Sequence, residues 1–363
     1  MLKQQKIFFD FLRFCIGSAK DIPDSLKEAD WQEIYAIAQK QALLGVLFYG
    51  IQRLPKELAP EQKLLMQWMV MAEQIRKQNI RQFQDSVKVC KNFENKGFAN
   101  CILKGQGNAL LYPDPYMRTP GDIDIYLAGG RKRVMQYINK VCPNQVMRYH
   151  HVDFPVMKTA IEVHFTPSYM FFPVHNRRMQ KWFKEVMGEQ CAHRVSLPDG
   201  YGEIHVPTAS FNVIYILSHL YRYIFTEGIG LRQLLDYYYV LISDDLLLIR
   251  DRVQKELKHL GLWKFAQAVM FVVKVVFGLS ENRMIAPMDE KEGRFLLDEI
   301  MRGGNFGQYD DRMGSKGGES KIHRYFRMNL RNLRFVKHYS TEAVCEPIFR
   351  TWFAGWKFIN RIK

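Results

Sequence analysis

Gly121-Asp122-Ile123-Asp124-Ile125-Tyr126-Leu127 is the segment from which the fold of this chain can be inferred. Apolar and polar residues alternate along it, which predicts a β-strand. Residues i and i+2 of a strand point to the same side, so Asp122 and Asp124 are expected side by side. Two neighbouring carboxylates repel, and burying either one without compensation costs several kcal/mol. A divalent cation removes that cost, and carboxylate oxygens are ligands that suit Mg²⁺.

A third carboxylate lies in the alternating segment 160–165. The pattern places Glu162 and His164 on one face and the apolar residues on the other. If this strand lies beside the first, Glu162 joins Asp122 and Asp124. Two cations held by three carboxylates stabilise the attacking and leaving oxygens of an in-line phosphoryl displacement. These three acids are therefore the predicted catalytic residues and metal ligands.

A phosphate-binding turn is expected before the first of these strands. Lys104-Gly105 follows the apolar run 101–103, which indicates a strand that leads into a turn. Glycines at Gly105 and Gly107 would let backbone N–H groups approach phosphate oxygens, and the dipole of a following helix would add to the attraction.

These residues resemble the DNA polymerase β-like nucleotidyltransferase superfamily. The Lys104-Gly105 turn, the Arg-x-x-Gly-Asp-x-Asp strand and the Glu-x-His strand are most similar to the uncharacterised bacterial nucleotidyltransferase family. The resemblance is close over residues 98–170 and general in the helical flanks. It implies an α+β fold: a small mixed nucleotidyltransferase sheet with flanking helices, between helical N-terminal and C-terminal regions.

The same resemblance implies a reaction. A nucleoside monophosphate, with AMP as the default, would move from a nucleoside triphosphate to an acceptor hydroxyl, with two Mg²⁺ ions and release of pyrophosphate. Asp122 and Asp124 would hold both ions, and Glu162 would complete one site and accept the hydroxyl proton. The acceptor is not specified: a small molecule, a sugar, a protein side chain and an RNA end are all compatible with these residues.

One position departs from the superfamily pattern. Gln106 stands where Ser or Gly usually follows the first glycine, so a hydroxyl contact to the phosphates is missing. The predicted nucleotide-binding residues include the turn Gly105-Gln106-Gly107, with Lys104 and Arg118 supplying positive charge. Three roles are open for His164: it contacts the nucleotide, it supports a metal ligand, or it is a structural histidine held by hydrogen bonds. Because of this departure, an alternative remains: the chain is an inactive module of this fold that binds nucleotide or nucleic acid.

A second stretch, 227–236, resembles the family's helical second domain, where a Gly-x-x-Leu-Arg-x-Leu-x-Asp pattern follows a helix with histidines. His219 is present on that helix, and Tyr223 stands where a second histidine is expected. Arg232 and Asp236 are four residues apart and can pair to brace the turn. Alternatively, Arg232 binds nucleotide, because a planar guanidinium matches phosphate geometry.

Patterning divides the chain into five parts. These are a helical N-terminal region (1–96), the nucleotidyltransferase α/β core (97–207), a helical domain completing the cleft (208–302), a Gly-rich loop (303–320) and a basic helical tail (321–363). The loop is expected to be mobile and is a candidate lid.

Shorter patterns predict elements inside the core. A helix is expected over 131–141, and strands over 145–150 and 152–157. Segments 194–197 and 203–206 flank an Asp-Gly turn and predict a hairpin.

Two groups of residues are assigned structural roles. His150 and His151 are adjacent on a predicted strand, so they should face opposite sides and not share a metal ion. Met66, Met69 and Met71 lie on a long predicted helix and are expected to fill the core.

Composition is that of a globular protein. The 363 residues are 47% hydrophobic and 25% charged, and no apolar run is long enough to span a bilayer. The N-terminal segment is expected to form an amphipathic helix and matches a secretion signal poorly. Six cysteines occur without a Cys-x-x-Cys pair, which argues against structural zinc or a disulfide framework and favours a reducing cytoplasm. The family resemblance implies that the cell is bacterial.

The net charge of +15 attracts polyanions but does not indicate which kind. A generally basic surface without a specific polyanion partner is an equal alternative. The tail 321–363 has ten Lys and Arg against Glu342 and Glu346, with aromatic and aliphatic residues between them. Such a helix docks on its own domain, on a partner or on an anionic membrane surface. A peripheral membrane or polysaccharide-assembly protein at the inner membrane face is therefore an alternative function.

Overall fold

A four-stranded mixed sheet lies at the centre of the computed structural model, which describes residues 2–313 and 320–360. Its spatial order is β1 (Asn100–Ile102), β2 (Ile123–Leu127), β4 (Ile161–His164) and β3 (His151–Asp153). The two inner strands, β2 and β4, are parallel, and each outer strand is antiparallel to its neighbour. The predicted α+β class is confirmed, with most of the chain helical.

One face of the sheet is covered by α4 (Gln62–Glu94) and α6 (Gly130–Val141), which share a core with it. Alternate residues of the two inner strands fill this core, as the sequence pattern predicted: Ile123, Ile125, Leu127, Ile161 and Val163. Burial of branched side chains on this face leaves the polar residues of the same strands on the opposite face.

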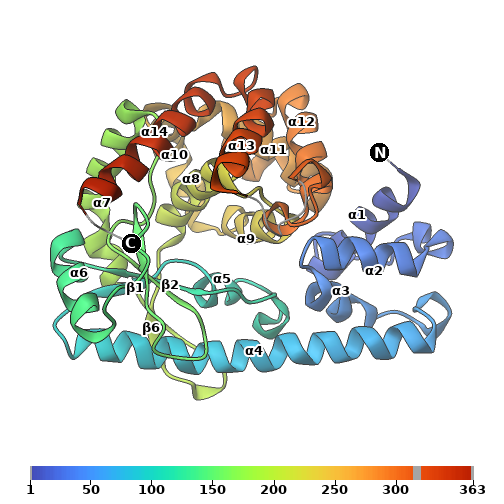
Figure 1. Cartoon of the computed structure of the whole chain (residues 1–363). Coiled ribbons are helices and arrows are strands. Elements are labelled where there is room, and N and C mark those ends of the chain that lie inside the picture. The colour runs from blue at the N-terminus through green and yellow to red at the C-terminus, as the bar shows by residue number, and fades with distance from the viewer. Residues whose placement is uncertain (1, 314–319, 361–363) are drawn as a thin grey trace.

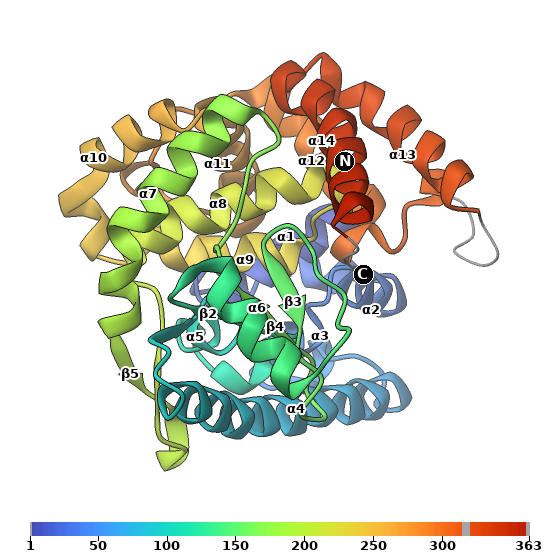
Figure 2. The ribbon, with the colours of Figure 1, turned by 60° about the vertical axis from the view of Figure 1, so that its left-hand side comes forward.

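Figures 1 and 2 show α4 along one side of the molecule and the C-terminal helices on the other side of the sheet. The remaining helices are α1 (Lys3–Ile16), α2 (Trp31–Lys40), α3 (Leu44–Ile51), α5 (Gln106–Ala109), α7 (Pro173–Ala192), α8 (Ala209–Thr226), α9 (Leu231–Leu241), α10 (Asp245–His259), α11 (Trp263–Phe277), α12 (Glu290–Gly303), α13 (Lys321–Val336) and α14 (Ser340–Ile359). Short 3₁₀ turns η1 to η7 connect them at Asp24–Glu28, Lys56–Leu58, Pro115–Met117, Pro198–Gly200, Glu281–Arg283, Asn305–Gly307 and Asp311–Met313.

The inward stripe of α4 differs from the one expected. Trp68, Ala72 and Ile75 face the core, at helical spacing. Met66 and Met69 fall between those positions and are 56% and 51% exposed. The prediction that they fill the core was wrong, and Met71 is only partly buried.

Two predicted strands are shorter than their sequence patterns. Segment 145–150 contributes only an isolated bridge between Met147 and Val152, and Asn144 before it has a left-handed backbone with φ 65°. Strand β3 ends at Asp153, before Pro155, which cannot donate to a sheet. The predicted hairpin is present as β5 (Arg194–Ser196) and β6 (Glu203–His205).

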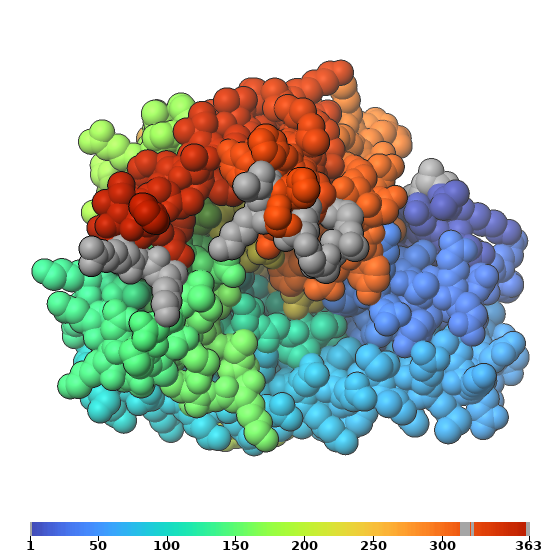
Figure 3. All heavy atoms as spheres, in the orientation of Figure 1, coloured from blue at the N-terminus to red at the C-terminus, as the bar shows by residue number. Residues whose placement is uncertain are grey.

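The basic tail is docked on the molecule. Figure 3 shows the C-terminal helices lying over the residues of the sheet region. The carboxylate of Glu342 accepts hydrogen bonds from the backbone N–H groups of Phe171 and Phe172 at 2.6 and 3.2 Å, and Asn332 donates to the carbonyl of Phe225. Among the apolar residues of α13, Phe335 is buried, whereas others remain exposed: Phe326, Leu330 and Leu333.

The loop expected over 303–320 is described up to Met313. In that part, Arg312 forms ion pairs with Asp310 at 2.7 Å and Glu299 at 2.9 Å, so this half of the loop is tied to α12. Residues 314–319 lie outside the described part, and the lid hypothesis stays a prediction. No helix among the described residues is long and apolar enough to cross a membrane.

Candidate active site

The two acidic strands lie side by side. In the parallel pair β2–β4, Asp124 is directly opposite Glu162. The adjacency on which the three-acid prediction depended is therefore confirmed, because a parallel pair in this register places both side chains on one face. Asp124 is 4% exposed, and Glu162 is partly buried.

Two nitrogen groups contact the carboxylate of Asp124. The ammonium Nζ of Lys104 and Nε2 of His164 each lie 3.0 Å from Oδ1. Burial raises the pKa of Asp124, but Lys104 and His164 more than offset it, and the pKa falls below its usual range. Asp124 is therefore ionised.

The pKa of Asp122 is shifted in the opposite direction. The negative charge of Asp124, then burial, raise the pKa of Asp122 to about 7, and Lys104 offsets only part of this. The rise expresses the repulsion expected between carboxylates two residues apart on a strand. A further cation near Asp122 would relieve it.

Glu162 is contacted by two histidines. Nδ1 of His151 lies 3.2 Å from Oε2, and Nε2 of His164 lies 3.7 Å from it. Burial lowers the pKa of His164, but its hydrogen bonds to Asp124 and Glu162 raise it further than burial lowers it. Burial raises the pKa of Glu162, but the contacts with His164 and His151 lower it by more, so the pKa lies below its usual value.

Three histidine rings cluster beside these acids. The ring centroids of His150 and His151 are 4.4 Å apart, and those of His164 lie 5.1 and 5.0 Å from them. The prediction that His150 and His151 face opposite sides was wrong, because His150 precedes β3 and does not follow strand alternation. Burial is the main cause that lowers the pKa of His151 to about 3 and that of His150 well below its usual value.

Only part of the predicted turn faces a cavity. Gly105 has φ 62°, a conformation that favours glycine. The side chain of Gln106 is buried, with Nε2 3.5 Å from Oδ1 of Asn79. A Cβ on Gly107 would lie 2.9 Å from Val206, so this glycine is required for packing. Because α5 has four residues, its dipole is small.

Arg118 and Arg232 have different partners from those expected. Arg118 donates to the carboxylate of Asp236 through Nε at 2.8 Å and Nη2 at 2.7 Å. The Tyr112 hydroxyl donates to the same carboxylate. Arg232 instead donates to the carbonyl of Thr119 at 2.8 Å. The Arg232–Asp236 pairing is therefore replaced by Arg118–Asp236, and both arginines line the cleft.

Two cavities meet at the acids. The narrower one, of about 40 Å³, is lined by Lys104, Gly105, Asn108, Arg118, Gly121, Asp122, Asp124, Ile216, His219, Leu220, Arg232, Gln233, Asp236 and Phe306. The larger, of about 640 Å³, has Glu162, the histidines His150 and His151, and residues of α8 and α14 on its surface. Both are lined by Lys104, Gly121, Asp122 and Phe306.

A model of the family described as "Uncharacterised nucleotidyltransferase" matches residues 27–278, which include the whole sheet, the Gly105 turn and α9. The chain belongs to this family. Membership supports nucleotidyl transfer as the general chemistry and a nucleoside triphosphate as a substrate. Comparison with curated proteins and with solved structures gave no match.

The donor atoms at this site fit a divalent cation. Asp124, Glu162 and His164 each offer one ligand atom, and these atoms lie within 4.8 Å of one another. His150, His151 and His164 form a second such group. Asp122 belongs to neither group and lies where the two cavities meet. Carboxylate oxygens suit Mg²⁺ and Mn²⁺, whereas an imidazole nitrogen shifts the preference toward transition-metal ions.

The sequence patterns did not assign three further residues to this site. Nε2 of His219 lies 3.1 Å from Nζ of Lys104, and the ring of Tyr223 packs 4.1 Å from that of His219. Arg222, on the same helix, lines the larger cavity. A signal was available: α8 is apolar along most of its length, so an arginine and a histidine three residues apart on it require buried partners.

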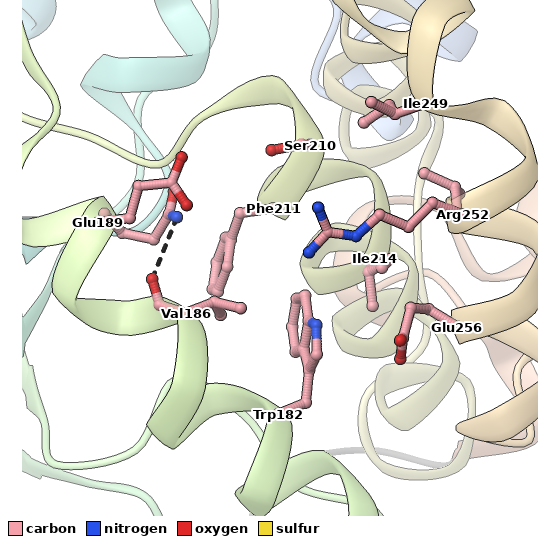
Figure 4. A pocket seen from close by; sticks show the side chains of 11 residues that line it. Trp182, Val186, Glu189, Ser210, Phe211, Ile214, Ile249, Arg252 and Glu256 are labelled. Carbon is pink, nitrogen blue, oxygen red and sulfur yellow. Dashed lines mark hydrogen bonds between the residues drawn. The ribbon is translucent and has the colours of Figure 1, made fainter.

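Another pocket lies between α7, α8 and α10 (Figure 4). Trp182 and Phe211 stack there at 5.2 Å, and Arg252 and Glu256 extend from α10. It shares no lining residue with either cavity at the acids, and we assign it no part in the chemistry.

Proposed function

We propose that this protein transfers a nucleoside monophosphate, AMP by default, from a Mg²⁺-bound nucleoside triphosphate to an acceptor hydroxyl. One observation carries the proposal: Asp124 and Glu162 lie opposite each other on adjacent parallel strands, and Asp122, just before the first of these strands, lies where two cavities meet. A reaction between two bound molecules needs such a junction, because its rate depends on holding both reactants in line.

The narrower cavity is proposed to bind the triphosphate. Lys104, Gly105 and Arg232 line it, and together they supply two positive charges and a glycine turn. The space in the narrower cavity is about 40 Å³, and we propose that a lining group moves when the triphosphate binds. Phe306 is suited to this role because it lies on a short turn and borders both cavities.

Asp122, Asp124 and Glu162, with His164, would hold one or two Mg²⁺ ions. When bound, the ions neutralise charge on the phosphates and on the reacting oxygens. Without them, Lys104 and His164 supply the positive charge beside Asp124. On nucleotide binding, the Lys104 ammonium is expected to turn from Asp124 to a phosphate oxygen, since both lie on the narrower cavity.

In the transfer step, the acceptor oxygen forms a bond to the α-phosphorus as the bond to the α–β bridging oxygen breaks. Pyrophosphate leaves with the electron pair of that bond. Glu162 accepts the hydroxyl proton in this proposal, which is supported by its place on the larger cavity.

Pyrophosphate release tests this function. The parent is incubated with Mg²⁺, each of the four nucleoside triphosphates and a small-molecule extract, and compared with Asp122→Asn/Asp124→Asn. We expect release by the parent with one preferred nucleotide and none by the double variant. Mg²⁺-dependent nucleotide binding by the parent without release would instead identify an inactive binding module.

A second candidate, association with an anionic membrane surface, is favoured by the exposed apolar residues of the tail. Phe326, Leu330 and Leu333 on α13 are each at least 60% exposed and alternate with basic residues. Co-sedimentation with anionic vesicles that is lost in Phe326→Ser/Leu330→Ser would support it. Equal recovery with neutral vesicles, or none with either, would reject it.

A further inference from the structure

Arg222, a buried arginine on the larger cavity, forms no ion pair with a carboxylate among the described residues, although the charge of Glu227 acts on it from a longer distance. The side chain of Arg222 is 6% exposed. Its guanidinium lies over the rings of Tyr169 and Tyr223, each at 4.9 Å, and Nη2 is 3.3 Å from Nδ1 of His219. Its Nε is buried without a hydrogen-bond acceptor among the described residues. All of these neighbours are uncharged at neutral pH, given that the pKa of His219 is far below its usual value.

Two other buried arginines have a carboxylate partner, whereas Arg232, which donates to the carbonyl of Thr119, lines the narrower cavity proposed for the triphosphate. Arg118 has the carboxylate of Asp236, and Arg331 lies 3.9 Å from Asp310. A buried charge without a counter-charge is costly, so Arg222 is expected to have a role that its own chain does not satisfy. An anionic ligand would supply the missing charge.

The rest of the cavity surface favours an anion. Five cationic side chains line it: Lys104, Arg148, Arg222, Arg350 and Lys357. Three acids do so: Asp122, Glu162 and Glu227. Arg148 is exposed, and Arg350 already pairs with Glu346 at 3.1 Å. Arg222 is thus the buried cationic side chain of this cavity that has no carboxylate ion pair among the described residues.

Resting on the proposed function, we propose that the larger cavity binds the acceptor and that Arg222 recognises an anionic group of it, a phosphate or a carboxylate. The acceptor class is therefore an anionic, hydroxyl-bearing small molecule. Its hydroxyl would lie toward Asp122 and Glu162, where this cavity meets the narrower one. Tyr169 and Tyr223 would flank the charged group and hold the guanidinium plane in place.

The size and position of the cavity agree with this assignment. Its volume of about 640 Å³ falls within the range of small-molecule sites. Arg222 lines the larger cavity and is not among the residues of the narrower one, which separates it from the triphosphate turn.

Part of the cavity surface comes from outside the matched family range. Arg350, Phe353, Ala354 and Lys357 of α14 lie on it, whereas the family match ends at residue 278. Arg350 and Lys357 of the tail supply part of the positive charge of this cavity. Lys357 also donates a hydrogen bond to the carbonyl of Met147 at 3.1 Å. The tail therefore contributes to acceptor selection.

The test measures binding of inorganic phosphate and of acetate by isothermal titration calorimetry, in full-length protein saturated with Mg²⁺ and α,β-methylene-ATP. The nucleotide analogue fills the triphosphate position, so an added anion reports the second cavity. We expect one anion to bind, and Arg222→Gln to weaken it at least about tenfold while leaving the analogue affinity within about twofold. The tighter of the two anions names the acceptor's charged group.

Matched variants keep the test interpretable. Arg252→Gln changes an arginine of the pocket in Figure 4 and should leave anion binding unchanged. Arg148→Ala changes an exposed residue, so it should fold normally and weaken the anion about threefold. If Arg222→Gln does not fold, Arg222→Lys, which keeps the charge, serves in its place and should give an intermediate loss.

Three outcomes would overturn the proposal: neither anion binds, the affinity is equal in the parent and the Arg222 and Arg148 variants, or the Arg222 variant loses the nucleotide analogue instead. The last would place Arg222 on the donor. Failure of the proposed function is separate, because it appears as an analogue that does not bind or as absent pyrophosphate release. Anion titration without nucleotide then still compares Arg222→Gln with the parent.

Discussion

Arg118 and Asp236 form a buried two-point ion pair, with Nε–Oδ1 at 2.8 Å and Nη2–Oδ2 at 2.7 Å, between residues 118 positions apart in the chain. The pair joins the loop that precedes β2 to helix α9. It therefore fixes the helical part of the cleft relative to the acidic strand. The Tyr112 hydroxyl at 2.7 Å satisfies a further lone pair of the carboxylate, as buried ion pairs require.

Removing one partner of this pair should be costly. In Asp236→Ala, the Arg118 guanidinium stays buried without its counter-charge, and we expect the free energy of unfolding to fall by about 3–5 kcal/mol. Urea unfolding measures it. Arg118→Met/Asp236→Leu should recover most of the loss, while Lys27→Ala, which breaks an exposed pair with Asp24, should change little. A double variant no more stable than Asp236→Ala would contradict this interpretation.

Asp122 should make the cation-free protein less stable as pH rises. Its pKa in the folded state is about 7, raised mainly by Asp124, so between about pH 4 and pH 7 the folded state binds more protons than the unfolded state. Stability therefore falls with pH across that window. Asp122→Asn should flatten this fall and raise the thermal midpoint by at least about 2 °C near neutral pH.

Scanning fluorimetry in EDTA compares the parent and Asp122→Asn across this pH range. Added Mg²⁺ should stabilise the parent and have a smaller effect on the variant, because the cation compensates the same repulsion. A parent and variant with parallel pH profiles would show that Asp122 does not carry the strain.

His164 should influence which cation binds. Its Nε2 lies 3.0 Å from Asp124 and 3.7 Å from Glu162, and imidazole favours Mn²⁺ over Mg²⁺. We expect Mn²⁺ to bind the parent more tightly, and His164→Asn to weaken Mn²⁺ at least about tenfold with a smaller effect on Mg²⁺. Electron paramagnetic resonance of free Mn²⁺ measures the affinity. His259→Asn, at the exposed end of α10, is the control; an equal loss there would reject the assignment.

Glu342 should hold the tail over the cleft. It is 2% exposed and accepts from the N–H groups of Phe171 at 2.6 Å and Phe172 at 3.2 Å. Glu342→Ala leaves two buried donors unpaired, so we expect a loss of about 1–3 kcal/mol. The expected result in limited proteolysis is faster release of the tail than in Glu290→Ala, whose exposed pair is with Arg294. Unchanged proteolysis would mean that other contacts dominate.

The central part of the fold was predictable because strand alternation is a local property. Asp122 and Asp124 on one segment and Glu162 on the other occupy alternate positions among branched apolar residues, which fixes both the strands and the face of each acid. The parallel pairing of β2 with β4 does not follow from alternation alone. In the sequence, the adjacency of the two strands is only a condition, without a strand direction, and the structure shows the pair to be adjacent and parallel.

The remainder of the site depends on contacts between distant segments. Asp236 pairs with Arg118 rather than with Arg232 on its own helix, and no local spacing predicts a partner 118 residues away. His150 escaped strand alternation because it lies just outside β3. The positions of Met66 and Met69 were missed because their hydrophobicity was counted without the helical phase set by Trp68.

The most direct test of the central claim uses ATP labelled with ³²P at the α-phosphate. The parent, Asp124→Asn and Glu162→Gln are each incubated with Mg²⁺ and a pool of anionic small molecules, and labelled products are separated by chromatography. We predict a labelled acceptor with the parent and none with either variant, since both acids of the register pair Asp124–Glu162 are required. A labelled product formed equally by the parent and both variants would contradict the account.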